Sequence, residues 1–121
     1  MSKQLSFSPL ANQYMKNFRE MINNSEDKVD VTNSFALISC RFLQEVFPEN
    51  ADNIKDNDVT FQPSEQEFYK ISQDLFNEDY FQKIWQCSDL PSIIENFANS
   101  AYHRYTHITK HPQKSQMKIR V

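Results

Sequence analysis

Glycine is absent from this chain of 121 residues. Phosphate-binding loops, dinucleotide-binding turns and the nucleophile turn of serine hydrolases all need glycine, because their backbones take positive φ angles or approach a ligand closely. Tight β-hairpins also favour Asn-Gly and Asp-Gly pairs. The composition therefore argues against nucleotide-dependent enzymes and against an all-β fold, and it favours helices.

Cysteine and long apolar runs are also scarce. Cys40 and Cys87 are the two cysteines, and they do not form a CxxC motif. Both lie within helical patterns, so we expect reduced, buried side chains. The N-terminal residues lack the apolar stretch of a signal peptide, and no run approaches the ~18 apolar residues of a membrane span. We expect a cytoplasmic protein, or one exported without a cleavable signal peptide, that has no membrane partner.

Acidic residues are missing from the last 26 positions, because none follows Glu95. Residues 1–95 carry a net charge of −8 and residues 96–121 a net charge of +5, which together give −3. Such a division concerns what the surface attracts rather than the fold. The basic residues of this end are Arg104, Lys110, Lys114, Lys118 and Arg120, accompanied by His103, His107 and His111.

Aromatic residues are plentiful, with ten Phe, five Tyr and one Trp in a chain that is 39% hydrophobic. Large rings bury much area per residue, so an aromatic core can offset the modest apolar content. The length suits one domain with one hydrophobic core. We therefore expect a folded single domain rather than a disordered chain.

Apolar residues recur at helical spacing in five segments of the chain. The pattern predicts an all-α, single-domain irregular helical bundle of four main helices plus one short helix. Residues 1–111 would form the helical domain, and residues 112–121 a basic tail that is flexible or forms a strand with a partner. The expected helices are 9–23; a second from a cap at Asp30 or Thr32 to Phe47; a third opened by Ser64; a short fourth capped by Asn77 or Asp79; and a fifth capped by Asp89 and ended by Pro112.

The second and third predicted helices rest on different signals. The second is apolar around most of its circumference, which is typical of a central helix contacted on several sides. The third rests on a capping box in residues 64–67, which follow Pro63. Between them lies an acidic, Asn-rich connection that we expect to be solvated, with Ile54, Val59 and Phe61 as its apolar anchors.

His103 and His107 have the four-residue spacing with which helices present two metal ligands. A helical wheel places both opposite the apolar stripe of the fifth helix, and no carboxylate follows to complete a coordination sphere. We interpret them as exposed histidines and keep them as secondary candidates for a metal site or a pH sensor. No metal or other cofactor is predicted.

The short fourth helix carries Tyr80, Phe81, Ile84 and Trp85, more apolar surface than one helix face can bury. Core packing is the simpler interpretation of these rings. Any ring left exposed would be an anchor for a protein partner.

The basic end offers a second kind of contact. Its charges suit an acidic protein surface, or a phosphate backbone with tyrosine rings available for base stacking. Residues 116–121 alternate polar and apolar side chains, which is typical of a strand that could join the sheet edge of a partner. A solvated tail is the alternative.

These observations favour a non-enzymatic protein–protein interaction module: an adaptor, chaperone-like partner or inhibitor. The alternative is a nucleic-acid-binding module that uses the basic C-terminal segment. We expect another protein as partner, its identity unknown, and a homo-oligomer stays open. The predicted partner-binding residues are Tyr80, Phe81, Trp85, Arg104, Lys110, Lys118 and Arg120.

Overall fold

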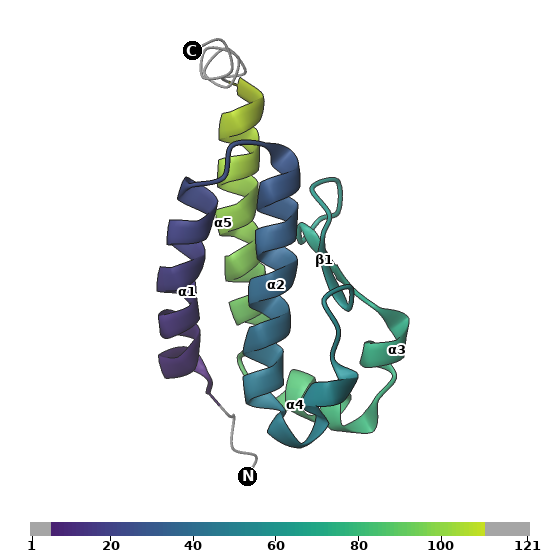
Figure 1. The fold of residues 1–121 in the computed structure, drawn as a ribbon. Coiled ribbons are helices and arrows are strands. Elements are labelled where there is room, and N and C mark those ends of the chain that lie inside the picture. The colour runs from purple at the N-terminus through teal and green to yellow at the C-terminus, as the bar shows by residue number, and fades with distance from the viewer. Residues whose placement is uncertain (1–5, 111–121) are drawn as a thin grey trace.

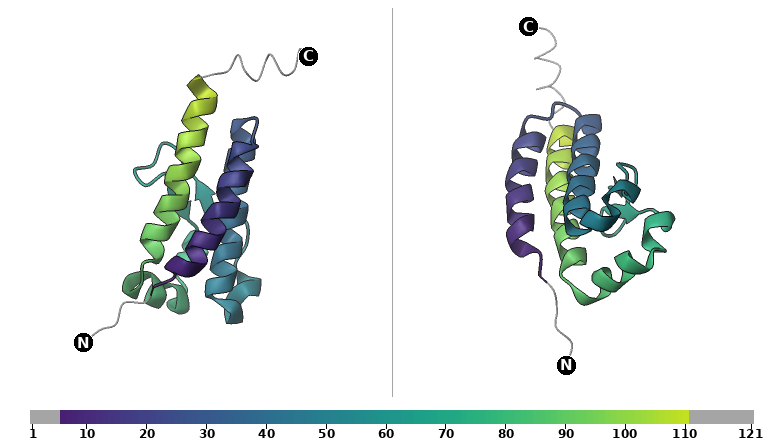
Figure 2. Two further views of the ribbon diagram at one scale, coloured as in Figure 1. Left: turned by 90° about the vertical axis from the view of Figure 1, so that its left-hand side faces the viewer. Right: turned by 60° about the horizontal axis from the view of Figure 1, so that its bottom comes forward.

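Three long helices form a bundle in the computed structural model, which describes residues 6–110. They are α1 (Ser8–Asn23), α2 (Lys28–Val46) and α5 (Leu90–Lys110). α1 and α5 run in the same direction and α2 runs against them (Figures 1 and 2). α2 packs against both other helices and against the hairpin, so it is the central helix that its apolar circumference predicted.

The chain between α2 and α5 forms a series of short elements on one side of α2, which we call the excursion (residues 47–89; Figure 1). The fold is a mostly helical single domain with four main helices, as predicted, and the short two-stranded hairpin is an addition. The elements of the excursion are the 3₁₀ helix η1 (Pro48–Asn53), β1 (Val59–Phe61), β2 (Tyr69–Ile71), α3 (Gln73–Phe76) and α4 (Asp79–Cys87).

Phenylalanine rings fill the centre of the bundle. Phe97 of α5 meets Phe18 of α1 at 5.9 Å and Phe42 of α2 at 5.5 Å between ring centroids, both edge to face. All three rings are fully buried. Edge-to-face pairs add to the free energy gained from burying apolar area, so these contacts hold the three helices together.

The start of α2 differs from the prediction. Asp27 is the N-cap residue, and its carboxylate accepts a hydrogen bond from the Asp30 N–H at 2.9 Å. Asp30 therefore lies in the first turn, where a negative charge is favourable. Thr32 instead donates from its hydroxyl to the Lys28 carbonyl inside the helix.

The predicted third helix is wrong. Residues 64–68 form the loop of an antiparallel hairpin in which Phe61 pairs with Tyr69 and Val59 with Ile71. The loop closes when the Gln62 N–H donates to the Phe68 carbonyl. Residues 64–67 do not form a helix, although they match the capping-box pattern, because strand pairing places Val59 and Phe61 in the core against α2.

Phe68 occupies the backbone position that a glycine would normally take in such a loop. Its φ angle is 68°, a left-handed conformation that is unfavourable for a residue with a Cβ. The Phe68 ring stacks on the Tyr102 ring of α5 at 4.0 Å between centroids, with only 6° between the planes. The hairpin thus forms without glycine because this stacking compensates for the backbone conformation.

Asp58 closes the base of the hairpin and is buried rather than solvated. Its carboxylate accepts hydrogen bonds from the Lys55 N–H and the Ser72 hydroxyl, each at 2.7 Å. The Ser72 hydroxyl in turn accepts from the Leu75 N–H and caps α3, the role that the sequence suggested for Ser64 in a longer helix. Ile54, Val59 and Phe61 are buried anchors, as predicted.

Asp89 directly precedes α5, but its carboxylate binds the N-terminal segment instead of capping that helix. It accepts hydrogen bonds from the Phe7 N–H at 2.9 Å and from the hydroxyls of Ser6 and Ser8. Burial would raise the pKa of Asp89, yet these hydrogen bonds outweigh it and lower the pKa below its ordinary value. The Ser88 hydroxyl accepts from the Leu90 N–H at the helix start.

The two cysteines have different surroundings. Cys40 is buried as predicted, and burial, together with the nearby Asp56 and Asp58 charges, raises the pKa of its thiol to about 11. A thiol of that pKa is protonated and unreactive near neutral pH. Cys87 is exposed, so the prediction of a buried side chain is wrong there, because it lies at the solvent-facing end of α4.

Within residues 6–110, none of the helices combines the length and the apolar composition needed to cross a bilayer. The predicted tail, residues 112–121, and the alternating segment within it lie outside the described residues.

Candidate functional site

The predicted partner-binding residues fall at two places in the described structure. Tyr80, Phe81 and Trp85 lie on α4, at the corner where the excursion meets the lower end of α2 (Figure 1). Arg104 lies on α5, near its C-terminal end. The side chain of Lys110 and the whole of Lys118 and Arg120 lie outside what the structure describes.

An aromatic cluster of Phe76, Phe81 and Trp85 forms on one side of α4. The Phe81 and Trp85 rings stack at 5.3 Å between centroids, and Phe76 meets them edge-on at 6.0 and 6.1 Å. Phe81 is fully buried, so it is not the exposed anchor that the sequence suggested and instead supports the other two rings. Trp85 is half-buried, and Phe76 is 41% exposed.

A hollow lies on the opposite flank of α4. On a helical wheel with Phe81 at 0°, Trp85 falls near +40° and Tyr80 near −100°, so the two flank the buried ring on opposite sides. The hollow has a volume of ≈ 430 Å³. Its lining residues are Val46, Phe47, Pro48, Glu49, Asn50, Tyr80, Lys83 and Ile84.

The Tyr80 ring packs edge-on against Phe47 at 5.2 Å, but its buried hydroxyl has no hydrogen-bond partner within the described residues. Burial, with smaller contributions from the charges of Glu78 and Asp58, raises the pKa of Tyr80. The hydroxyl is therefore protonated near neutral pH and keeps a hydrogen bond to donate. An unpaired buried hydroxyl is costly, which makes this flank of α4 incomplete by itself.

Arg104 is committed to an internal contact. Its guanidinium donates to the Ser25 carbonyl in the α1–α2 turn at 2.8 Å, and its buried Nε has no partner among the described residues. The side chain thus fastens the upper part of α5 to the turn. A contact between Arg104 and a partner would have to use the remaining edge of the guanidinium.

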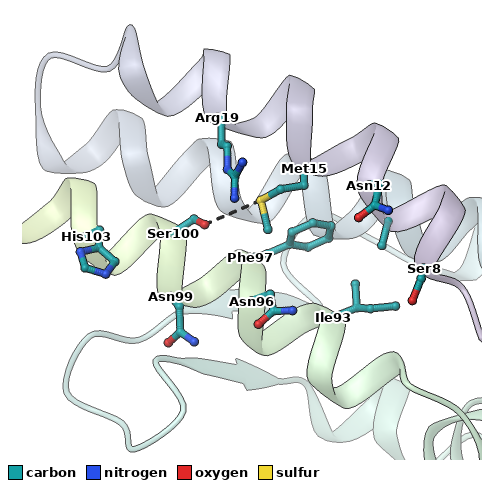
Figure 3. A pocket seen from close by; sticks show the side chains of 11 residues that line it. Ser8, Asn12, Met15, Arg19, Ile93, Asn96, Phe97, Asn99, Ser100 and His103 are labelled. Atoms are coloured by element: carbon teal, nitrogen blue, oxygen red, sulfur yellow. Dashed lines mark hydrogen bonds between the residues drawn. The ribbon is translucent and has the colours of Figure 1, made fainter.

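A groove runs between the parallel helices α1 and α5 (Figure 3). It consists of two hollows, of ≈ 340 and ≈ 390 Å³, that share Arg19, Ser100 and His103 in their walls, and we call both together the α1–α5 groove. The Ser100 hydroxyl donates to Met15 Sδ at 3.7 Å across it, although the two residues are 85 positions apart. The remaining lining residues are Ser8, Ala11, Asn12, Ile22, Asn23, Met15, Ile93, Asn96, Phe97, Asn99, Arg104 and His107.

The walls of the α1–α5 groove contain no Asp or Glu, in a chain whose acidic residues outnumber its Lys and Arg by 16 to 13. Arg19 extends from α1 into the space between the helices, close to the Ser100 and His103 positions of α5 (Figure 3). Asn12, Asn96 and Asn99 line the first hollow, Asn23 and Arg104 line the second, and Arg19 lines both. The groove thus combines cationic side chains with amides, and three of its four asparagines line the first hollow alone.

His103 and His107 are exposed, as the helical wheel predicted. In the part of the chain from residue 6 to 110, no three His, Cys, Asp or Glu side chains lie close enough together to hold a metal ion. Both histidines line the α1–α5 groove, beside Arg19, rather than an isolated solvent face.

Two features of these surfaces escaped the sequence analysis. Phe76 falls within the predicted third helix, whereas the short α3 that forms instead leaves its ring exposed. The α1–α5 groove joins residues more than 80 positions apart, so no local pattern could reveal it. The Asn residues of the fifth helix, at three-residue spacing, were the one available signal.

Comparisons of this chain with family models, with curated proteins and with solved structures found no match.

Proposed function

We propose that the protein is a non-enzymatic protein–protein interaction module whose main contact surface is the α4 corner. This surface comprises the rings of Phe76 and Trp85 on one flank of α4 and the hollow beside Tyr80 on the opposite flank. The observation that carries the proposal is the exposed Phe76 ring, which rests on two further aromatic rings. Among the described residues, only Val29 is a comparably exposed large apolar side chain.

The physical reason is the free energy of burying aromatic rings. Interfaces gain most of their affinity from a few aromatic or arginine anchors that become fully desolvated. Phe76 and Trp85 are already ordered by contact with Phe81, so a partner would lose little side-chain entropy by covering them. Rings that are already ordered before a partner binds are suited to act as interface anchors.

The lining of the hollow supports a proposal for the chemistry of the partner. Val46, Phe47 and Ile84 supply apolar walls, and Lys83 and Glu49 place one charge of each sign at the rim. The fitting occupant is an amphipathic helix of another protein that inserts an apolar side chain between these walls. The basic residues Arg104, Lys110, Lys118 and Arg120 would then set orientation and association rate.

The test compares two exposed apolar residues. Phe76→Ser should abolish recovery of the partner by affinity purification from the native host, and Val29→Ser, the matched control on α2, should leave it unchanged. Trp85 is the single tryptophan, so its emission should shift to shorter wavelength when the purified partner covers it. Equal recovery by both variants, with no emission shift, would contradict the proposal.

A second copy of the chain is the alternative occupant of this surface. Sedimentation of the wild-type chain over a range of concentrations distinguishes the two: dimerisation that Phe76→Ser abolishes would identify a homo-oligomer. A chain truncated after His111 tests the basic tail separately. Equal partner recovery from that chain would show that Lys118 and Arg120 are not needed.

A nucleic-acid-binding module is the second candidate function. The acid-free walls of the α1–α5 groove, with Arg19 and Arg104, favour anionic ligands in general. The net charge of −8 on residues 1–95 opposes it. A salt titration is decisive, because phosphate-dominated binding weakens linearly on a log–log plot.

A further inference from the structure

The α1–α5 groove has a chemistry different from that of the α4 corner. Its floor is apolar, formed by Ala11, Ile93 and Phe97, which are buried in the core. Its rims carry amide side chains from both helices, because Asn12 on α1 and Asn96 and Asn99 on α5 all line the first hollow. A narrow apolar floor between two polar rims is a shape that fits an extended chain.

The three amides are exposed. No side-chain hydrogen bond joins Asn12, Asn96 or Asn99 to another of the residues 6–110. Each side-chain amide offers an N–H₂ donor and a carbonyl acceptor, the same pair that a peptide group presents. Asparagines on two facing helices can therefore hydrogen-bond the backbone of a peptide from both sides, whatever its sequence.

The cationic side chains add a preference for one side chain of the ligand. Arg19 points into the groove, and its guanidinium can bind a carboxylate through two parallel hydrogen bonds. No acidic side chain lines the groove to compete for it. A ligand whose backbone lies along the asparagines would thus place an Asp or Glu side chain near Arg19.

The arrangement suits a peptide better than a nucleic acid. A phosphate backbone needs a row of cations, whereas the first hollow of this groove carries neutral amides and Arg104 is occupied by the Ser25 carbonyl. The length also fits, because α1 rises ~24 Å over its helical length, which equals about seven extended residues.

We propose that the α1–α5 groove is a second binding site, for an extended peptide segment that carries an acidic side chain. Asn12, Asn96 and Asn99 bind its backbone, and Arg19 binds its carboxylate. The site shares no lining residue with the α4 corner.

The experiment uses the full-length chain and an array of random peptides of about seven residues, the length of extended chain that the groove accommodates. Bound peptides should be enriched in Asp and Glu. Combining Asn96→Ala with Asn99→Ala should weaken the best peptide about tenfold or more, and Arg19→Glu should remove the preference for acidic residues.

Two matched control residues lie on α1 within one helical turn of Arg19. Asn17→Ala removes an exposed amide outside the groove, and Lys16→Glu makes the same charge change as Arg19→Glu. Both should leave the affinity within about twofold, because exposed charges outside the contact contribute little. Thermal melting followed by circular dichroism verifies that each variant is folded.

Three results would overturn the proposal. The first is an array without enrichment of acidic residues. The second is unchanged peptide affinity in the double asparagine variant. The third is a short oligothymidylate that binds through Arg19 while all peptides fail, which would make the groove a nucleic-acid site.

Discussion

The bundle and the excursion are held together in different ways. In the bundle, fully buried rings from three helices meet at one point, with Phe97 between Phe18 and Phe42. In the excursion, ring contacts such as those of Phe61 with Phe35 and Tyr105 are spread along the segment, and the polar contacts of Asp58 close the base of the hairpin. From this difference we expect the bundle to unfold as one cooperative unit and the excursion to open separately.

The largest effect is expected from Phe97→Ala. Removing this ring leaves a cavity at the meeting point of three helices, so the free energy of unfolding should fall by about 3–5 kcal/mol. Urea denaturation measures the loss. Phe76→Ala, which removes an exposed ring in the excursion, should lower the free energy of unfolding far less. Equal losses in the two variants would contradict the proposed difference between the bundle and the excursion.

Asp58→Ala should have an intermediate effect. It leaves the Lys55 N–H and the Ser72 hydroxyl without their acceptor, which costs about 1–3 kcal/mol. Hydrogen exchange should speed up in the hairpin and remain slow in α2 and α5. Asp52→Ala, an exposed neighbour, is the control; a uniform loss of protection across all helices would show that the excursion does not open separately.

The smallest effect concerns Phe68, where two variants must be compared. Phe68→Ala and Phe68→Gly both lose the ring stacked on Tyr102, so their difference isolates the backbone conformation. Because φ is 68°, the glycine variant should be more stable than the alanine variant by about 1 kcal/mol. Thermal denaturation shows which of the two variants is more stable. A more stable alanine variant would show that the loop relaxes to another backbone conformation.

The two proposed surfaces can be separated by the same kind of comparison. Phe76→Ser changes the α4 corner and leaves every lining residue of the α1–α5 groove in place. The double asparagine variant does the reverse. Loss of one binding activity without the other would show two sites, and the failure of either proposal leaves the other open to test.

Local sequence pattern was sufficient where a helix is long and amphipathic. The apolar spacing of residues 9–23 and of the fifth helix, with Pro112 after it, located α1 and α5 closely, and the wheel placed His103 and His107 outside. Of the candidate site, the sequence pointed to α4 and its rings. It predicted Phe81 as a partner-binding residue, whereas the ring is fully buried. The reason is that periodicity identifies the apolar face of a helix but not the elements that pack against that face.

By itself, the sequence determined that this is a helical, aromatic-rich single domain with α2 at its centre, because those properties follow from composition and from spacing within one helix. Tertiary structure decided the hairpin, the exposure of Phe76 and the α1–α5 groove. Each depends on residues far apart in the chain, such as Asp58 with Ser72 or Arg19 with His103. In the folded domain, burial of Val59 and Phe61 against α2 outweighs the local preference of residues 64–67 for a helix.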